Sequence, residues 1–162
     1  MTQRDAIETT PLGAGPVTRQ ASARLVVRTR GPGFTDITHA VRRWLTTTGI
    51  ANGLLTVFCR HTSASLTIQE NADPDVRTDL ATALDRLAPR DRAYVHAIEG
   101  PDDMPAHIRT MLTDASLAVP VVGGRLALGT WQGIYLIEHR DRPHEREVLV
   151  AAIGAAQDEA SA

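Results

Sequence analysis

The segment GTWQGIYLIEHR, residues 129–140, joins a run of strand-forming residues to a charged end. Successive side chains of a regular strand point to opposite faces, so Glu138 and His139 should point apart unless a β-bulge intervenes. A Glu–His dyad between these two neighbours is therefore not expected. We expect Glu138 either to face a site built partly by another element or to pair with an arginine such as Arg146.

Other short apolar runs lie on both sides of this segment and are separated by turns rich in glycine and proline. They predict strands at residues 23–29, 54–59, 66–68, 117–122, 125–128, 131–138 and 146–153. These strands gather toward the two ends of the chain, with helices between and beside them. Because the order does not alternate regularly between strand and helix, the sequence predicts an α+β protein.

Three segments have the spacing of helices. The first covers residues 37–45 and is predicted to be capped by Thr35 or Asp36. The second begins at Asp73, and the third at Asp103, where in each case a proline follows the carboxylate within two residues. The predicted inner faces are Val76, Leu80, Leu84 and Leu87 in the second helix, and Ile108, Met111 and Leu112 in the third.

The chain of 162 residues is long enough for one domain with a modest tail. Residues 1–20 mix Thr, Gly, Pro and charge without a period, which predicts a flexible N-terminal tail. Residues 21–155 would form the domain, and residues 156–162 a frayed C-terminus. We find no internal repeat and no linker that would divide the chain.

Composition excludes several classes of chemistry. All 17 basic residues are arginine, so no lysine is present to form a Schiff base. Cys59 is the only cysteine, which excludes an intrachain disulfide and a Cys₄ zinc site. The net charge of −2 gives no basic footprint for nucleic acid.

No membrane partner is expected, because no window approaches the ~20 apolar residues of a membrane span. The first residues also lack the charged start and apolar run of a signal peptide. We therefore expect a cytoplasmic protein.

One polar segment, RHTSAS at residues 60–65, follows a predicted buried strand. The hydroxyls of Thr62, Ser63 and Ser65 are suited to hydrogen-bond phosphate oxygens close to the N-terminus of the next helix. The alternative is a capped turn in which these hydroxyls satisfy the local backbone.

A second polar segment, residues 94–107, carries two histidines and two neighbouring aspartates. Asp103 and His107 are four residues apart, so they face the same side of a helix that begins there. The pair suits a metal site or acid–base chemistry; alternatively, Asp103 only caps the helix and His107 is its surface neighbour. Without an HExxH or paired-cysteine pattern, carboxylates and water favour Mg²⁺ over zinc.

These segments resemble the YjbQ-like family of small bacterial and archaeal proteins. The resemblance covers roughly residues 20–154, and its most specific motifs are EGPDDMPAH and GTWQ. The matching stretches include HTSASL at 61–66, EGPDDMPAH at 99–107, GTWQGI at 129–134 and EHR at 138–140. The longer N-terminal tail and the charged turn at 141–145 are particular to this chain.

The resemblance implies an α+β fold with a large mixed β-sheet, packed with two to three helices and assembled as a homotrimer. It also implies a weak, secondary thiamine-phosphate synthase activity, which need not be the main role. That transferase reaction of thiamine biosynthesis joins hydroxymethylpyrimidine diphosphate to a thiazole phosphate and releases pyrophosphate. The expected partners are therefore a phosphorylated small molecule and further copies of the chain.

For such a transferase we expect catalysis from His107, His96 and Glu70. Mg²⁺ would neutralise the leaving pyrophosphate, although zinc or another transition metal is also open. The expected substrate-binding residues are His61, Thr62, Ser63, Ser65, Arg77, Gln132 and Glu138; the expected metal ligands are Asp79, Asp102 and Asp103, with Glu70 as a further candidate.

Two other functions fit the same residues. In the first, the trimer is a non-catalytic module that binds a metal or a phosphorylated metabolite. In the second, the protein is a metal-dependent hydrolase that uses His61, His96 and His107. Tight, stoichiometric transition metal in the purified protein would favour the hydrolase, and a stable ligand without turnover would favour the binding module.

Overall fold

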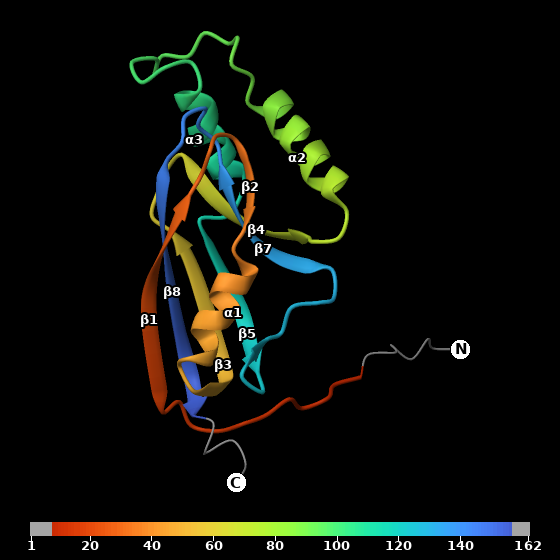
Figure 1. Ribbon diagram of the computed structural model, residues 1–162. Coiled ribbons are helices and arrows are strands. Elements are labelled where there is room, and N and C mark those ends of the chain that lie inside the picture. Colours follow the sequence, from red (N-terminus) through yellow and green to blue (C-terminus); the bar gives the residue numbers. More distant parts are fainter. Residues whose placement is uncertain (1–7, 157–162) are drawn as a thin grey trace, which may run out of the picture.

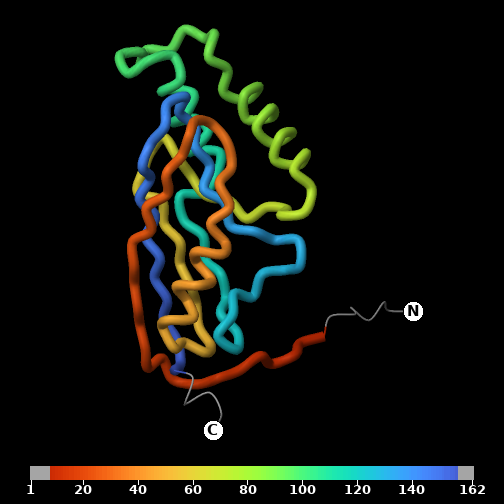
Figure 2. Tube along the Cα trace, viewed as in Figure 1, coloured from red at the N-terminus to blue at the C-terminus, as the bar shows by residue number. Residues whose placement is uncertain are grey.

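The computed structural model describes residues 8–156 and contains two antiparallel sheets with three helices (Figures 1 and 2). The elements are β1 (Arg19–Arg28), β2 (Gly33–Asp36), α1 (Thr38–Thr46), β3 (Ile50–Cys59), β4 (Ala64–Glu70), α2 (Pro74–Leu87), α3 (Asp103–Leu112), β5 (Ser116–Val122), β6 (Arg125–Leu126), β7 (Gln132–Glu138) and β8 (Glu145–Ala156). The α+β class expected from the sequence is confirmed.

The strands are arranged as a five-stranded sheet, β1-β8-β3-β5-β6, and a three-stranded sheet, β2-β7-β4. Every strand pairing in the described part of the chain is antiparallel. The structure thus has two antiparallel sheets in place of the single large mixed sheet that the resemblance implied. Among the described strands, only the neighbours β5 and β6 are joined directly by a tight turn, and the other paired strands come from distant parts of the chain.

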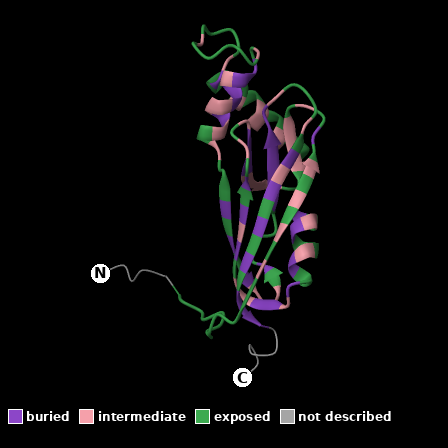
Figure 3. Ribbon diagram, turned by 90° about the vertical axis from the view of Figure 1, so that its left-hand side faces the viewer, coloured by how far each residue is buried: buried purple, intermediate pink, exposed green. Residues whose placement is uncertain are grey.

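The core lies between one face of the five-stranded sheet and a second layer made by α1 and the three-stranded sheet, which contributes Leu66, Ile134 and Leu136 (Figure 1). Along β8 and β5, buried and exposed residues alternate, as the banding of the long strands in Figure 3 shows. Val41 and Leu45 of α1 meet Leu55 and Val57 of β3 in this core. The opposite face of the sheet is solvent-exposed and still carries the large apolar side chains Val26, Leu54, Phe58, Leu149 and Ile153.

The second helix begins where the sequence predicted, but its apolar face is not buried. Asp73 Oδ1 accepts the Asp75 amide at 2.8 Å, and Pro74 occupies the first helical position. No residue of α2 is buried, and Leu87 is largely exposed, because the helix stands away from the strands in Figure 1. The predicted inner face is only partly covered within this chain.

The inner face predicted for α3 is wrong for Met111 and Leu112, and Ile108 is only partly buried. The helix buries Asp103, Pro105, Ala106 and Arg109, whereas Met111 is 79% exposed and Leu112 is exposed as well. The polar face is turned inward because it finds partners there. Arg109, for instance, donates to the Ala88 carbonyl at 3.1 Å and pairs with Asp85 at 2.8 Å.

The chain ends differ slightly from the expected domain limits. β1 begins at Arg19, inside the predicted tail, and β8 includes Ala156, where fraying was predicted. The rest of the two terminal predictions, residues 1–7 and 157–162, lies outside the described residues. Within residues 8–156, no helix combines the length and the apolar character needed to cross a bilayer.

Candidate functional site

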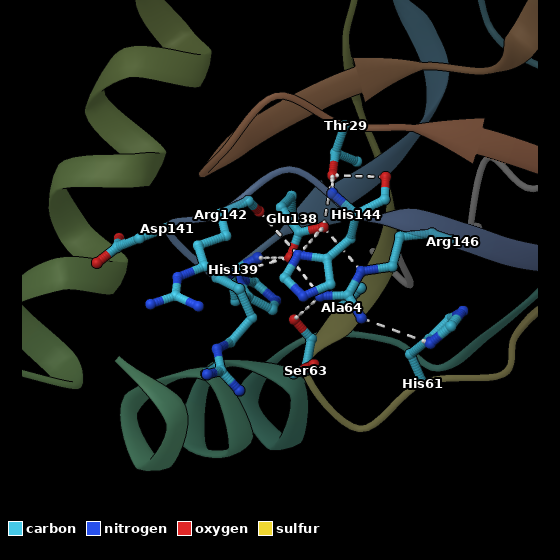
Figure 4. Close-up of polar contacts among 12 residues, drawn as sticks. Thr29, His61, Ser63, Ala64, Glu138, His139, Asp141, Arg142, His144 and Arg146 are labelled. Atoms are coloured by element: carbon cyan, nitrogen blue, oxygen red, sulfur yellow. Dashed lines mark hydrogen bonds and ion pairs between the residues drawn. The ribbon is translucent and has the colours of Figure 1, made fainter. Parts of the chain in front are cut away.

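Three consecutive residues at the end of β7, Glu138, His139 and Arg140, send their side chains to three different parts of the molecule; Figure 4 shows the first two. Glu138 contacts Arg146 of β8, His139 contacts Ser65 of β4, and Arg140 contacts the start of α3. The side chains of Glu138 and His139 do point apart, as the strand alternation predicted. The end of β7 therefore connects the two sheets to α3.

Glu138 lies in a closed cluster with Thr29 and Arg146, which we call the Glu138 cluster. Arg146 Nε donates to Oε2 at 2.7 Å and its Nη2 donates to Oε1 at 2.5 Å, which confirms the predicted arginine partner. Thr29 Oγ1 donates to Oε2 at 2.8 Å, and the amides of residues 139 and 140 donate to Oε1. Burial alone would raise the pKa of Glu138, but these donors together hold that pKa below its ordinary value.

His139 is buried and neutral. Burial, assisted by the charge of Arg109, lowers the pKa of His139 to about 4. Ser65 Oγ lies 2.8 Å from His139 Nε2 and 2.7 Å from Thr113 Oγ1, and the Thr113 hydroxyl is also 2.7 Å from the Arg109 carbonyl. Ser65 was predicted to bind substrate; the structure places it inside the core with both of its hydrogen-bonding roles in use.

Arg140 joins β7 to the start of α3. Its Nε donates to Asp102 Oδ2 at 2.9 Å, its Nη1 donates to Asp103 Oδ1, and its Nη2 donates to the Glu99 carbonyl at 2.9 Å. Burial would raise the pKa of Asp102, but the Asp141 amide and Arg140 outweigh it, and the pKa falls below the ordinary value. Asp102 is thus held in structural hydrogen bonds.

Asp103, His96 and His107 form an open cluster, which we call the Asp103 cluster. Asp103 Oδ2 lies 2.7 Å from His96 Nε2 and 3.3 Å from His107 Nε2, and the two rings are 5.6 Å apart between centroids. In the described part of the chain, these residues are the one group of three or more His, Cys, Asp or Glu whose ligand atoms all lie within 4.8 Å. The predicted same-side placement of Asp103 and His107 is confirmed.

The hydrogen bonding of His107 bears on what the Asp103 cluster holds. His107 Nδ1 lies 3.0 Å from the Thr62 carbonyl oxygen, to which it must donate. A neutral ring then has a lone pair on Nε2, facing a carboxylate oxygen at 3.3 Å. Two lone-pair atoms this close repel each other unless a proton or a metal ion lies between them. A backbone carbonyl that fixes the opposite nitrogen is also the usual partner of a metal-binding histidine.

An open hollow of about 590 Å³ lies directly beside His107. It is lined by Phe58, Cys59, Arg60, His61, Thr62, His107, Thr110, Met111 and Ala115. A second hollow of about 350 Å³ touches His96 on the other side of the cluster. The Asp103 cluster therefore has open space next to both of its histidines.

Several predicted site residues lie elsewhere. Glu70 ends β4, six residues beyond Ala64, which at ~3.3 Å per residue places it about 20 Å from the start of the strand. Its Oε1 accepts the Asp73 amide at 3.3 Å, next to Arg77, which stacks 5.5 Å from the Tyr135 ring centroid. Asp79 is exposed on α2, and Gln132 accepts the Gly129 amide at 2.8 Å. None of these four belongs to the Asp103 cluster.

Sequence reasoning missed the role of Arg140, which sets the orientation of Asp103. The one signal was the run EHR at the end of a buried strand, because a charge there needs a partner. The sequence could not show that the partner would be a pair of aspartates nearly 40 residues earlier.

The fold and the site define a class: a small protein of two antiparallel sheets and three helices, with a histidine–aspartate cluster where α3 meets β7. The model of the family described as "UPF0047 protein YjbQ-like" matches residues 23–155. The chain belongs to this family.

Relatives and solved structures agree with that assignment. A UPF0047 protein of Synechocystis is 54% identical over 137 residues, covering 84% of this chain and 93% of the relative. UPF0047 protein YjbQ of Escherichia coli O157:H7 is 40% identical over 131 residues, covering 80% and 95%. A crystal structure of a YjbQ/UPF0047 family protein from Clostridium acetobutylicum has a TM-score of 0.75 at 40% identity, covering 80% and 98%.

Proposed function

We propose that the protein is a metal-dependent enzyme that acts on a phosphorylated small molecule, and that thiamine-phosphate synthesis is the reaction to test first. The observation that carries the proposal is the 3.3 Å approach of His107 Nε2 to Asp103 Oδ2, where a proton or a metal ion must lie between the two atoms because Nδ1 donates to the Thr62 carbonyl. Together with His96, they supply three ligands and leave further positions open toward the adjoining hollows. An open coordination position is what distinguishes a catalytic metal site from a structural one.

The donor set favours a transition metal. Two imidazole nitrogens and one carboxylate oxygen suit zinc, iron or manganese, whereas Mg²⁺ prefers oxygen ligands and retained water. Asp103 Oδ1 is already engaged by Arg140, so Asp103 has only Oδ2 left as a ligand. Although Mg²⁺ was the first expectation from the sequence, the proposed site is better suited to zinc.

In the proposed reaction, the metal would offset negative charge on the leaving diphosphate. The chain's own residues provide the positioning. The Thr62 carbonyl fixes the His107 ring, and Arg140 fixes the carboxylate of Asp103, so the ligands are aligned before substrate arrives. His61 is not a member of this cluster. The geometry therefore supports a site of two histidines and an aspartate over a hydrolase of three histidines.

We also propose that the chain assembles as a homotrimer. The exposed face of the five-stranded sheet carries Leu54, Phe58, Leu149 and Ile153, and α2 has no buried residue. Contiguous apolar surface of this kind is typical of association sites. Light scattering on the purified protein measures the number of copies directly, and a monomer at micromolar concentration would contradict the trimer.

The function is tested with zinc-loaded and EDTA-treated protein supplied with hydroxymethylpyrimidine diphosphate and thiazole phosphate. We expect thiamine phosphate to form only with metal. We expect His107→Ala to lower the rate at least tenfold, about 1.4 kcal/mol of barrier. His39→Ala, on the exposed side of α1, is the matched control and should leave the rate unchanged.

Each outcome separates the candidate functions. Product that does not depend on metal or on His107 would remove the Asp103 cluster from the reaction. Stoichiometric zinc without product would support the binding-module alternative. Protein that binds neither zinc nor another divalent transition metal would overturn the proposed function.

A further inference from the structure

The ring of His61 faces a second basic group with no acceptor between them. The Glu147 amide donates to His61 Nε2 at 2.7 Å. A neutral imidazole has only one nitrogen that accepts, so Nδ1 carries the hydrogen. Burial and the charge of Arg146 lower the pKa of His61, which keeps the ring neutral. Nδ1–H therefore points toward Arg146 Nη1 at 3.5 Å, and two donors face each other (Figure 4).

Arg146 has no alternative use for this nitrogen among the described residues. Its Nε and Nη2 serve Glu138, and Nη2 also reaches the Ser63 carbonyl at 3.4 Å. For Nη1, His61 Nδ1 is the one partner within hydrogen-bond distance. Because the Arg146 side chain is only 5% exposed, bulk water cannot readily replace the missing acceptor.

The local charge balance favours an anion at this point. Arg24 and Arg60 both pair with Glu147, at 3.0 and 2.9 Å, while Arg146 pairs with Glu138. Three arginines thus share two carboxylates, which leaves one positive charge in excess. The Arg60 pair is exposed and can give way at little cost when a ligand binds.

His61 also lines the hollow of about 590 Å³ that adjoins His107. Phe58 and Met111 give this hollow an apolar surface, while Arg60 and Thr62 give it a polar one. Thr62 lies between the His61–Arg146 pair and the Asp103 cluster. Its carbonyl orients His107, and its neighbour His61 carries the donor that has no acceptor. One short turn, residues 60–63, therefore lies next to both the donors and the Asp103 cluster.

We infer that His61 Nδ1 and Arg146 Nη1 form an oxyanion-binding subsite for the phosphate group of a small molecule whose apolar or ring-shaped body lies in the hollow. A phosphate oxygen that sits to the side of this pair, within hydrogen-bond distance of both nitrogens, would accept from both and give each donor an acceptor. Charge-assisted hydrogen bonds from arginine are among the stronger ones available. Only the expectation that the other end of this molecule meets His107 rests on the proposed function.

The test measures phosphate binding to the full-length, EDTA-treated protein, by calorimetry and by the shift of the His61 ring nitrogens in NMR spectra. Arg146 is unsuitable for substitution because Glu138 would lose its partner. Two variants of His61 provide a matched pair. His61→Asn keeps a donor near the position of Nδ1, whereas His61→Gln keeps polarity only near Nε2.

We expect saturable binding of inorganic phosphate, weakened at least tenfold by His61→Gln, or about 1.4 kcal/mol, and less than threefold by His61→Asn. Zinc binding at the Asp103 cluster should be the same in both variants. An adventitious, non-saturating response up to about 10 mM phosphate, or equal binding by His61→Gln, would overturn the subsite. Phosphate binding without any metal binding would preserve the subsite and overturn the proposed function instead.

Discussion

Glu138 and Asp103 are nearly equally buried carboxylates, and each is held by an arginine, yet their oxygens are used differently. Glu138 is 1% exposed and receives hydrogen bonds on both oxygens from Arg146, Thr29 and two backbone amides. Asp103 is 2% exposed and receives Arg140 on Oδ1 alone, while two imidazoles share Oδ2. The Glu138 cluster is complete with protein groups, whereas the Asp103 cluster needs a proton or a metal ion between Oδ2 and His107 Nε2.

On the proposed function, this difference separates a stabilising cluster from a metal-binding one. A buried carboxylate with all of its donors supplied by the chain contributes to the fold, and any change leaves a charge without a partner. A carboxylate oxygen that lies close to two imidazole nitrogens can bind a metal ion together with them. Substitutions at the two positions should therefore affect different measurable properties.

The largest expected effect on stability is that of Glu138→Gln. This change leaves the Arg146 charge buried without its partner, so the free energy of unfolding in urea should fall by about 3–5 kcal/mol. Asp103→Asn is the matched change in the other cluster. It should cost far less in EDTA, because Arg140 keeps Asp102 and is only partly buried. Similar losses of unfolding free energy in the two variants would show that the two clusters do not differ in this way.

The next effect is a loss of folding stability at acidic pH, caused by the buried neutral ring of His139. The pKa of His139 is about 4 in the folded protein, below the ordinary value of 6.5 that applies once the chain unfolds. Between these values the unfolded state binds more protons, so stability falls as the pH drops from about 6.5 toward 4, by up to about 3 kcal/mol.

The matched variant for this test is His139→Gln, whose side-chain amide can hydrogen-bond to Ser65 either as donor or as acceptor. The difference in unfolding free energy between wild type and variant, measured across this pH range, isolates the contribution of the histidine. A constant difference across the range would show that His139 does not titrate as described.

The smallest of the three effects is the stabilisation by zinc, which should differ between variants of the two clusters. Zinc at about 100 times its dissociation constant should raise the free energy of unfolding of the wild type by about 2.7 kcal/mol. Asp103→Asn should lose most of this gain, whereas Glu138→Gln, although unstable, should keep it. Thermal unfolding with zinc and with EDTA measures both. Equal gains in all three proteins would place the zinc elsewhere.

Local rules predicted the parts of the site that depend on one element. Strand alternation separated Glu138 from His139, charge pairing indicated Arg146, and helical spacing brought Asp103 and His107 to one side. His96 was named from its segment, but nothing local fixed its contact with Asp103, since it lies in a stretch without regular structure.

The errors have a common physical cause. Glu70 was grouped with His96 and His107, but it ends β4, and an extended strand carries the chain far in a few residues. The inner face of α3 was assigned to apolar residues, and the structure instead buries Asp103 and Arg109, whose partners come from other segments. Contacts between segments distant in sequence determine both the position of Glu70 and the buried face of α3. Such contacts cannot be predicted from local patterns in a single sequence.

The three consecutive side chains at the end of β7 also help to fix the register of β7 against its neighbouring strands. A shift of β7 by one residue against β2 and β4 would turn every side chain to the opposite face. Glu138 would then meet the core around Ser65, Arg146 would be left buried without its carboxylate, and Asp103 would lose Arg140 from Oδ1. A shifted register would thus lose all three contacts and be destabilised at each of them. These residues therefore favour the correct register in addition to shaping the site.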